Sequence, residues 1–170
     1  MLRKALCSIM VAFSVMAADF SVPFIKKAPV IDGRLDAGEW DSAMAVSGSA
    51  KDMDARRTTL WMCYGKDAIY IALQAETPPR GNLVAGHRWI NHDDSLELWF
   101  APPAHLRVVD SLKFGAFQII VNSKEQFLAE HHNPGFGLGS VQWKHNAQIK
   151  SSVEDGLWTM ELAFPTKQMS

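Results

Sequence analysis

Hydrophobic and polar residues alternate in short runs along most of this chain, and groups of glycine, proline, aspartate and lysine separate the runs. Successive side chains of a strand point to opposite faces, so this pattern is typical of strands in an antiparallel sheet. The strands that it predicts are 58–64, 68–74, 95–100, 114–121, 126–130, 147–153 and 157–164. Many short strands with almost no helix predict an all-β fold, an antiparallel β-sandwich of the immunoglobulin or jelly-roll kind.

The alternation also predicts which side chains share a face. Leu60 and Cys63 should lie on opposite faces of the first strand, with Trp61 beside Cys63. In 95–100, Glu97 and Trp99 should lie opposite the three apolar side chains of that strand. Helix is expected only as one short turn over 36–45, because Asp36 and Glu39 have the spacing of a capping box.

The first residues of the chain predict an export signal. Arg3 and Lys4 precede an uncharged run of apolar and small residues over 5–17, which ends in side chains that a signal peptidase accepts. That run is shorter than the roughly 20 residues that a membrane-spanning helix needs. We therefore expect a signal peptide over 1–17, a lead-in over 18–27 and one domain over 28–170. The protein would be secreted or periplasmic, with no membrane segment after cleavage.

Composition and charge exclude several kinds of partner and chemistry. Seventeen Lys and Arg stand against 18 Asp and Glu, whereas nucleic-acid binding needs clustered basic residues, so no nucleic acid is expected. Cys7 would leave with the signal, and Cys63 is expected to be a buried free thiol. The sequence has no Gly-x-Ser-x-Gly elbow, no phosphate loop and no recognisable Cys–His pair, so we expect no enzyme and no catalytic residue.

Short motifs follow one another in a fixed order over residues 28–167. They are Pro29-Val-Ile-Asp-Gly-Arg-Leu-Asp36 with Trp40, the stretch from Tyr64 to Tyr70, Asp94-Ser-Leu-Glu-Leu-Trp-Phe100, Gln118 with Val121-Asn122, and Gly156-Leu-Trp158 with Glu161 and Phe164-Pro165. As an ordered set they resemble the family 9 carbohydrate-binding modules, which are DOMON-like β-sandwiches. The resemblance implies a non-catalytic domain that binds carbohydrate and serves polysaccharide degradation, attached to or beside a glycoside hydrolase.

The resemblance also implies where the sugar would bind. It places the site at the strand that begins near Asp94, at the loop before this strand, and at the next strand. A pyranose ring stacks its apolar face on an aromatic ring, and its hydroxyls need planar polar partners. The candidate ligand-binding residues are therefore Trp89 as the platform, with Asp93, Asp94, Gln118 and Asn122 as hydroxyl partners.

The sequence departs from the family pattern at three places. Trp89 stands two positions further from Asp94 than the family's aromatic residue, and Ile120 takes the position at which the sugar-binding members have arginine. The sequence ends at Ser170, before the strands that bring a second tryptophan and an asparagine to the sugar in the family. The sequence therefore predicts a sandwich that lacks the family's last strands, as in a C-terminally truncated member.

Several other residues have a structural interpretation. Asp32, Gly33 and Asp36 are expected to form a turn and a cap. Trp residues within strand patterns are expected to pack in the core or on a sheet surface: these are Trp61, Trp99, Trp143 and Trp158. Glu97 and Glu161 lie inside strands, where each is either solvent-facing or buried and hydrogen-bonded.

Two further functions and one metal stay open. Distantly similar sandwiches hold haem between Met, His or Lys ligands, so a haem-binding electron carrier is the first alternative; a structural or interaction sandwich without a small ligand is the second. No cofactor is required by the sequence. Asp93, Asp94 and Glu97 could supply oxygen ligands to a structural calcium ion. The adjacent His131 and His132 would point to opposite faces of a strand, which disfavours zinc.

Overall fold

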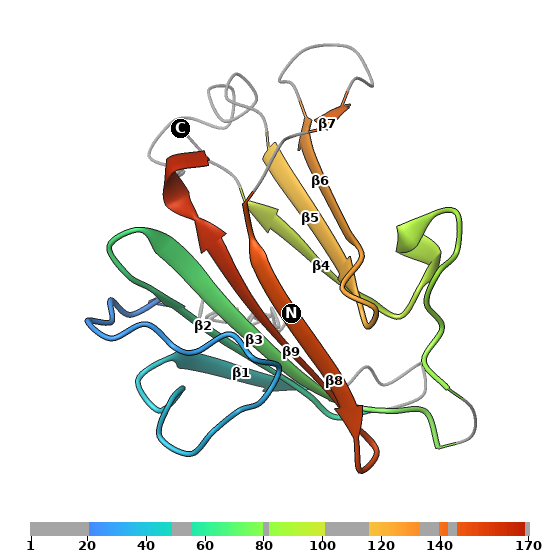
Figure 1. The fold of residues 1–170 in the computed structure, drawn as a ribbon, viewed down its shortest axis with the longest axis horizontal. Helices are drawn as coiled ribbons and strands as arrows, with labels where there is room; N and C mark the ends of the chain where they lie inside the picture. Colours follow the sequence, from blue (N-terminus) through green and yellow to red (C-terminus); the bar gives the residue numbers. More distant parts are fainter. Residues whose placement is uncertain are drawn as a thin grey trace, which may run out of the picture.

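Two antiparallel sheets pack face to face in the computed structural model, which describes residues 21–48, 56–79, 82–100, 116–132, 140–142 and 146–168 (Figure 1). Sheet A has the strand order β1-β2-β3-β9-β8, and sheet B has the order β4-β5-β6-β7. Sheet A consists of β1 (Met44–Gly48), β2 (Thr58–Tyr64), β3 (Ala68–Glu76), β8 (Gln148–Glu154) and β9 (Leu157–Pro165). Sheet B consists of β4 (Ser95–Phe100), β5 (Ala116–Asn122), β6 (Phe127–His132) and β7 (Ser140–Gln142). The predicted all-β sandwich is confirmed.

The core lies between the two sheets because each strand directs alternate apolar side chains inward. Leu73 and Met160 from sheet A meet Ile119 and Val121 from sheet B in one buried cluster. The partly buried side chains of Leu60, Leu96, Leu98 and Phe100 pack against this cluster, as the alternation predicts. Trp158 is also buried here, at 4% exposure. Burial of these side chains supplies the main free energy of folding.

The outer face of sheet A is covered by the segment that precedes β1 (blue in Figure 1). Trp40 from this segment packs with Cys63 and Ala72 of sheet A in a second buried cluster. The segment also adds an isolated parallel bridge, since the backbone N–H of Ile25 donates to the Tyr64 carbonyl at 2.8 Å. Cys63 is a buried free thiol, as expected, and burial raises its pKa to about 11. The central strands β3 and β9 of sheet A are therefore covered on both faces.

Glu161 joins the covering segment to sheet A. Its side chain is fully buried on the outer face of the sheet, in β9. Oε2 accepts the backbone N–H groups of Asp32 and Gly33 at 2.9 and 2.8 Å, and Oε1 accepts the indole N–H of Trp40 at 3.0 Å. Burial raises the pKa of this carboxyl, and the three donated hydrogen bonds oppose that rise only in part.

Gly33 is the position at which this arrangement needs a glycine. Its φ is +87°, and a Cβ there would meet the backbone N of Ser151 at 3.3 Å. Asp32 completes the turn, because its carboxylate accepts the backbone N–H of Arg34 at 3.0 Å. The expected turn at Asp32 and Gly33 is confirmed, and it brings two consecutive N–H groups to the Glu161 carboxylate.

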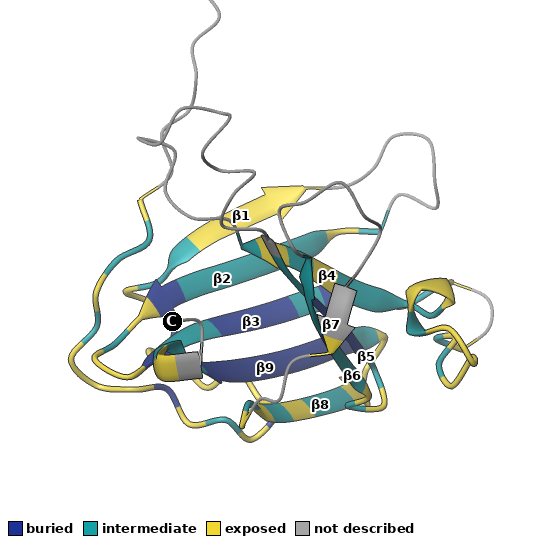
Figure 2. Ribbon diagram, turned by 90° about the horizontal axis from the view of Figure 1, so that it is seen from above, coloured by how far each residue is buried: buried dark blue, intermediate teal, exposed yellow. Residues whose placement is uncertain are grey.

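The structure differs from the sequence-based elements over 36–45 and at strands β1 and β7, and it adds two short 3-10 helices, η1 (Ile90–His92) and η2 (Thr166–Gln168). The helical turn expected over 36–45 is wrong: this stretch forms hydrogen-bonded turns, with the Ala43 N–H donating to the Trp40 carbonyl, and it leads into β1. Instead of capping a helix, the Glu39 carboxylate accepts the backbone N–H of Val30. Strands β1 and β7 were not predicted. β1 is largely exposed (Figure 2), so it lacks the apolar alternation that marks a buried strand.

Some expectations fall outside the described residues. The signal peptide over 1–17 and Trp143 belong to this part of the chain, so export stays a prediction. Among the described residues, no helix has the length and apolar character needed to cross a membrane.

We expect Glu161→Ala to lower the free energy of unfolding by about 3 kcal/mol or more, because three buried N–H donors would lose their acceptor. Urea unfolding followed by circular dichroism measures this loss. The matched control is Glu154→Ala, which removes an exposed carboxylate at the end of β8 and should change stability by less than about 0.5 kcal/mol. Equal urea midpoints for the two variants would contradict the role of Glu161.

The raised pKa of Glu161 also predicts how the stability of the domain depends on pH. Between its ordinary value of 4.5 and its raised value in the fold, the native state holds a proton that the unfolded chain releases. Stability from this group is therefore fully present below pH 4.5 and is lost as the pH rises through the folded pKa. The measurement is the free energy of unfolding of the wild type minus that of Glu161→Gln. This difference should fall as the pH rises from 4.5 through the folded pKa. A difference that rises with pH would refute the assignment.

Candidate functional site

The predicted binding residues lie on sheet B and on the loop that leads into it. Asp93 and Asp94 directly precede β4, after the 3-10 helix η1 (Ile90–His92), and Asn122 ends β5. Trp89 stands directly before η1. Gln118 lies four positions before Asn122 on β5 and therefore has its side chain on the same face of the strand.

Asp93 holds the loop before η1 in place. Its two carboxylate oxygens accept the backbone N–H groups of Gly86 and His87, both at 3.0 Å. Oδ2 also accepts Nδ2 of Asn122 at 2.7 Å. Partial desolvation raises the pKa of Asp93, but the hydrogen bonds from Gly86, Asn122 and His87 outweigh it and lower the pKa below its ordinary value. The hydrogen bonds of this carboxylate therefore stabilise the loop before η1.

Asp94 has a similar structural role. Its Oδ2 accepts the backbone N–H of Val84 at 2.7 Å, and the Val84 carbonyl in turn accepts the Asp94 N–H at 2.8 Å. Oδ1 forms an ion pair with the Arg56 guanidinium at 3.1 Å. Asp94 therefore connects the loop before β4 to the residues that precede β2.

Asn122 is fully buried and uses all of its hydrogen-bonding capacity. Its Nδ2 donates to Asp93 and to Oε1 of Gln126, the latter at 2.6 Å, and its Oδ1 accepts the backbone N–H groups of Lys124 and Gln126 at 3.0 Å. An amide offers two donor and two acceptor positions, and here all four are filled. Asn122 therefore fixes the β5–β6 turn and joins it to the loop of Asp93.

Trp89 is the exposed member of the predicted group, with 62% of its surface accessible. The Arg88 guanidinium carbon lies 5.4 Å from the centroid of its indole ring, a cation–π geometry. The structure thus brings Asp93 and Asn122 into direct contact and places Trp89 on the same loop. A contact between the predicted residues and a ligand stays a prediction.

A second group of side chains lies on the outer face of sheet B, the face directed away from the core. Trp99 of β4 is 54% exposed there, and its indole N–H donates to Oε1 of Glu97 at 2.7 Å. The same oxygen accepts Nε2 of Gln118 at 2.6 Å. Gln118 Oε1 lies 2.8 Å from Nε2 of His132 on β6. An aromatic ring and three polar side chains thus form one connected network.

His132 completes this group from the neighbouring strand. Its ring centroid is 4.9 Å from that of Trp99, with an angle of 34° between the planes, and its Nε2 lies 3.7 Å from Oε2 of Glu130. His131, the preceding residue, instead stacks on Phe117 at 4.6 Å. The two adjacent histidines thus have separate neighbours, and strand geometry directs them to opposite faces.

Sequence reasoning identified Gln118 but missed its partners as site residues. It placed Glu97 and Trp99 together on one face of 95–100, which the structure confirms, and assigned Trp99 to packing. His132 could not be connected with them, because the strand register that brings Ala116 opposite His132 and Gln118 opposite Trp99 is a long-range property. An exposed aromatic residue beside a carboxylate on one predicted face is the signal that could have indicated this group.

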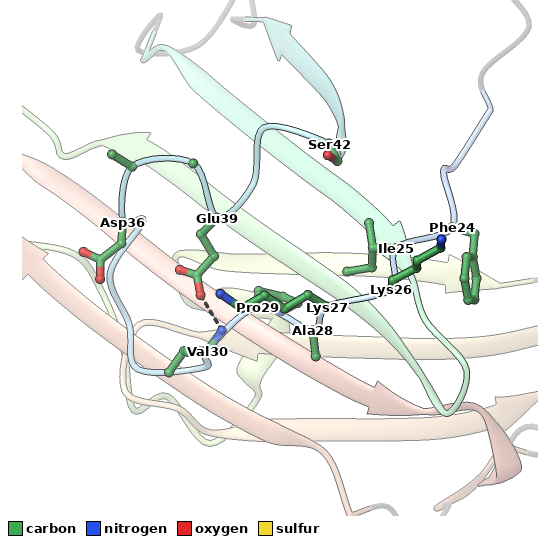
Figure 3. A pocket seen from close by; sticks show the side chains of 12 residues that line it. Phe24, Ile25, Lys26, Lys27, Ala28, Pro29, Val30, Asp36, Glu39 and Ser42 are labelled. Carbon is green, nitrogen blue, oxygen red and sulfur yellow. Dashed lines mark hydrogen bonds between the residues drawn. The ribbon is translucent and has the colours of Figure 1, made fainter.

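The described residues offer no metal site, and they enclose a hollow away from the predicted binding residues. They contain no group of three or more His, Cys, Asp or Glu side chains that could hold a metal ion. A hollow of about 560 Å³ lies between residues 24–30 and the turn at 36–42 (Figure 3). Lys26, Lys27 and Asp36 line it together with Glu39, which is bonded to Val30. This hollow contains none of the predicted binding residues.

The two packed antiparallel sheets define the protein as a β-sandwich. No protein-family model matches the chain, and a search of curated proteins finds no match. Among solved structures, the fold is similar to a family 9 carbohydrate-binding module from Caldicellulosiruptor kristjanssonii. In its complex with cellotriose that structure has a TM-score of 0.58 and 17% identity, over 85% of this chain and 66% of the other.

Two further structures show the same likeness. The Caldicellulosiruptor module in complex with glucose gives a TM-score of 0.56 and 14% identity, over 85% of this chain and 68% of that one. A protein of Bacteroides uniformis ATCC 8492 named for carbohydrate binding gives a TM-score of 0.58 and 10% identity, over 88% of this chain and 75% of that one. This chain thus has the fold of a family 9 carbohydrate-binding module and spans about two thirds of the Caldicellulosiruptor structures.

We expect Asn122→Ala to destabilise the domain by about 2–4 kcal/mol, because the buried network with Asp93 and Gln126 would lose its central amide. Hydrogen exchange at the amides of Gly86 and His87 should also accelerate, since Asp93 would lose the partner that orients it. Asn91→Ala, an exposed position in η1, is the matched control and should leave both readouts unchanged. Unchanged exchange in Asn122→Ala would show that Asn122 does not hold the loop.

Proposed function

We propose that this domain is a non-catalytic carbohydrate-binding module that binds its ligand on the outer face of sheet B. The observation that carries the proposal is Trp99, a large aromatic side chain that is 54% exposed on the outer face of β4, an edge strand of sheet B. An exposed aromatic ring offers a flat apolar surface with a polar N–H at its edge, which suits both parts of a sugar. In this proposal Trp99 is the stacking platform for the apolar face of a sugar ring.

The polar neighbours of Trp99 suit the hydroxyl groups of a sugar. Glu97 fixes the indole ring through its N–H and also holds the Gln118 amide, so the two planar polar groups are oriented beside the platform. Such a rigid arrangement reduces the entropy lost when a ligand binds. Glu97 is exposed and Gln118 is partly exposed, so both can exchange water for sugar hydroxyls.

The similar structures support this proposal at the level of the fold. The Caldicellulosiruptor modules hold cellotriose and glucose, and we extend carbohydrate binding, as a class, to this chain. The predicted export signal supports action outside the cytoplasm, in the periplasm or as a secreted protein. A glycoside hydrolase, as a neighbouring domain or separate protein, is the partner that such a module would serve.

In this proposal most of the residues predicted from the sequence support the site rather than contact the sugar. Asp93, Asp94 and Asn122 direct their polar groups to the protein itself, so they hold the loop and the β5–β6 turn beside the sheet. Gln118 contacts the sugar directly. Trp89 is exposed on the loop and is the alternative stacking platform. Comparing the Trp89→Ala and Trp99→Ala variants distinguishes the two.

We expect Trp99→Ala to weaken saccharide binding at least tenfold, because the stacking platform would be lost. Isothermal titration calorimetry with a panel of mono- and oligosaccharides measures this effect without depending on tryptophan emission. Trp89→Ala is the matched control and should change affinity by less than threefold. A large loss in Trp89→Ala with none in Trp99→Ala would move the site to the loop.

A further inference from the structure

We propose that a second ligand site lies on the outer face of sheet A and binds a small primary alkylamine in its charged form. The feature that carries this inference is a hollow of about 310 Å³ beside Trp61, between the sheet and the segment before β1. Trp61 and Ala45 line it from the sheet, and residues 35–38, 40, 41 and 43 line it from the segment. We call it the Trp61 hollow.

Small side chains around Trp61 create this hollow. In the strand register, Trp61 lies opposite Ala45 of β1 on one side and opposite Ala72 of β3 on the other. Residues opposite each other in antiparallel strands share a face, so the large ring stands between two small side chains. Ala72 is fully buried in the cluster that contains Trp40, whereas Trp61 is only partly buried. The Trp61 ring therefore keeps accessible apolar surface beside the hollow.

Two carboxylates give the Trp61 hollow its charge. Asp36 and Asp41 both line it, and both are exposed. No hydrogen bond or ion pair connects either carboxylate with another described residue, whereas the carboxylates of Asp32 and Glu39 in the same segment accept backbone N–H groups. The described residues that line the hollow include no Lys, Arg or His. Its negative charge is therefore uncompensated.

The backbone of the segment holds these two carboxylates in place. The Glu39 N–H donates to the Asp36 carbonyl at 3.2 Å, and the Ala43 N–H donates to the Trp40 carbonyl at 2.9 Å. Gly38 has a φ of +84°, and a Cβ there would lie 4.0 Å from Oδ2 of Asp41, so the Asp41 side chain folds back over the turn. A site whose walls are already ordered loses less entropy when a ligand binds.

A primary alkylammonium group matches this combination of surfaces. Its nitrogen has three hydrogen-bond donors and no acceptor, which suits two carboxylates that only accept. A cation within about 6 Å of a tryptophan ring is attracted to the face of the ring, and an alkyl stem can lie along apolar side chains such as Leu35. The volume is at the small end of ligand sites, which begin at about 300 Å³. The occupant is therefore a small amine and not a polypeptide.

The test is a titration of the full chain with n-butylammonium chloride, followed by the NMR signal of the Trp61 indole N–H, which the Trp61→Phe variant assigns. We expect a saturable shift with a dissociation constant of about 1 mM, weakened by added salt because the carboxylates are exposed. n-Butanol keeps the alkyl chain and replaces the ammonium group with a hydroxyl. It should bind about tenfold more weakly, because it lacks the charge.

Substitutions that remove the charge and keep the shape test the two carboxylates. Asp36→Asn and Asp41→Asn should each weaken n-butylammonium binding by about threefold, and the double variant by about tenfold. Asp155→Asn is the matched control, an exposed aspartate in the turn between β8 and β9, and should change nothing. The backbone NMR spectrum of each variant shows whether it is folded.

Three results would overturn this inference. The first is equal affinity for n-butanol and n-butylammonium, and the second is a folded double variant that binds as the wild type does. The third is displacement of n-butylammonium by calcium chloride at about 1 mM, which would assign Asp36 and Asp41 to a metal ion. The Trp61 hollow lies on sheet A and the proposed carbohydrate site on sheet B, so failure of either proposal leaves the other intact.

Discussion

A carboxylate buried on the outer face of sheet A determines how the rest of this domain is arranged. Glu161 accepts hydrogen bonds from the backbone of Asp32 and Gly33 and from the Trp40 indole, so the segment before β1 is held against the sheet. A buried charge is expensive unless donors surround it. The requirement is therefore mutual: the segment satisfies Glu161, and Glu161 fixes the segment that covers Cys63 and Ala72.

The covered centre of sheet A contrasts with the outer side chains of β4 at the edge of sheet B. β9 is buried along almost its whole length, whereas β4 alternates between partly buried and exposed side chains (Figure 2). Inward side chains of β4 complete the core, so its outward side chains are free to serve a ligand. In the proposed function, sheet A supplies stability and sheet B binds the ligand. Substitutions at the exposed positions of β4, Glu97 and Trp99, should thus cost little stability.

The parts of this fold that local patterns encode could be predicted, and those that depend on long-range pairing could not. β2 and β4 have the bounds that alternation predicts, because each has one face in the core. β7 is three residues long and β1 is mostly exposed, so neither carries a periodic apolar signal. The motif Asp-Gly with a distant Glu is present in the sequence, but only the structure shows that Glu161 is the acceptor for that turn.

The same distinction between local pattern and long-range contact applies to the candidate site. Carboxylates and amides near Asp94 are the residue types that bind sugars, yet the same chemistry holds loops together. The sequence cannot distinguish these uses, because they depend on whether N–H groups of the protein already occupy the acceptors, as they do at Asp93 and at the amide oxygen of Asn122. Gln118 differs because its partners, Glu97 and His132, are themselves side chains on an accessible face.

Ile120 affects the charge on the outer face of sheet B, because an apolar side chain stands there beside Glu97. Ile120 is buried and lies opposite Glu97 across the β4–β5 pair, so no cation from this position neutralises that carboxylate. Glu97 instead uses one oxygen to hold Trp99 and Gln118. Hydroxyl groups of a neutral saccharide could donate to the Glu97 carboxylate, whereas the Glu130 carboxylate already lies 3.7 Å from Nε2 of His132. In the proposed site Glu97 would thus favour neutral hydroxyl donors over acidic sugars.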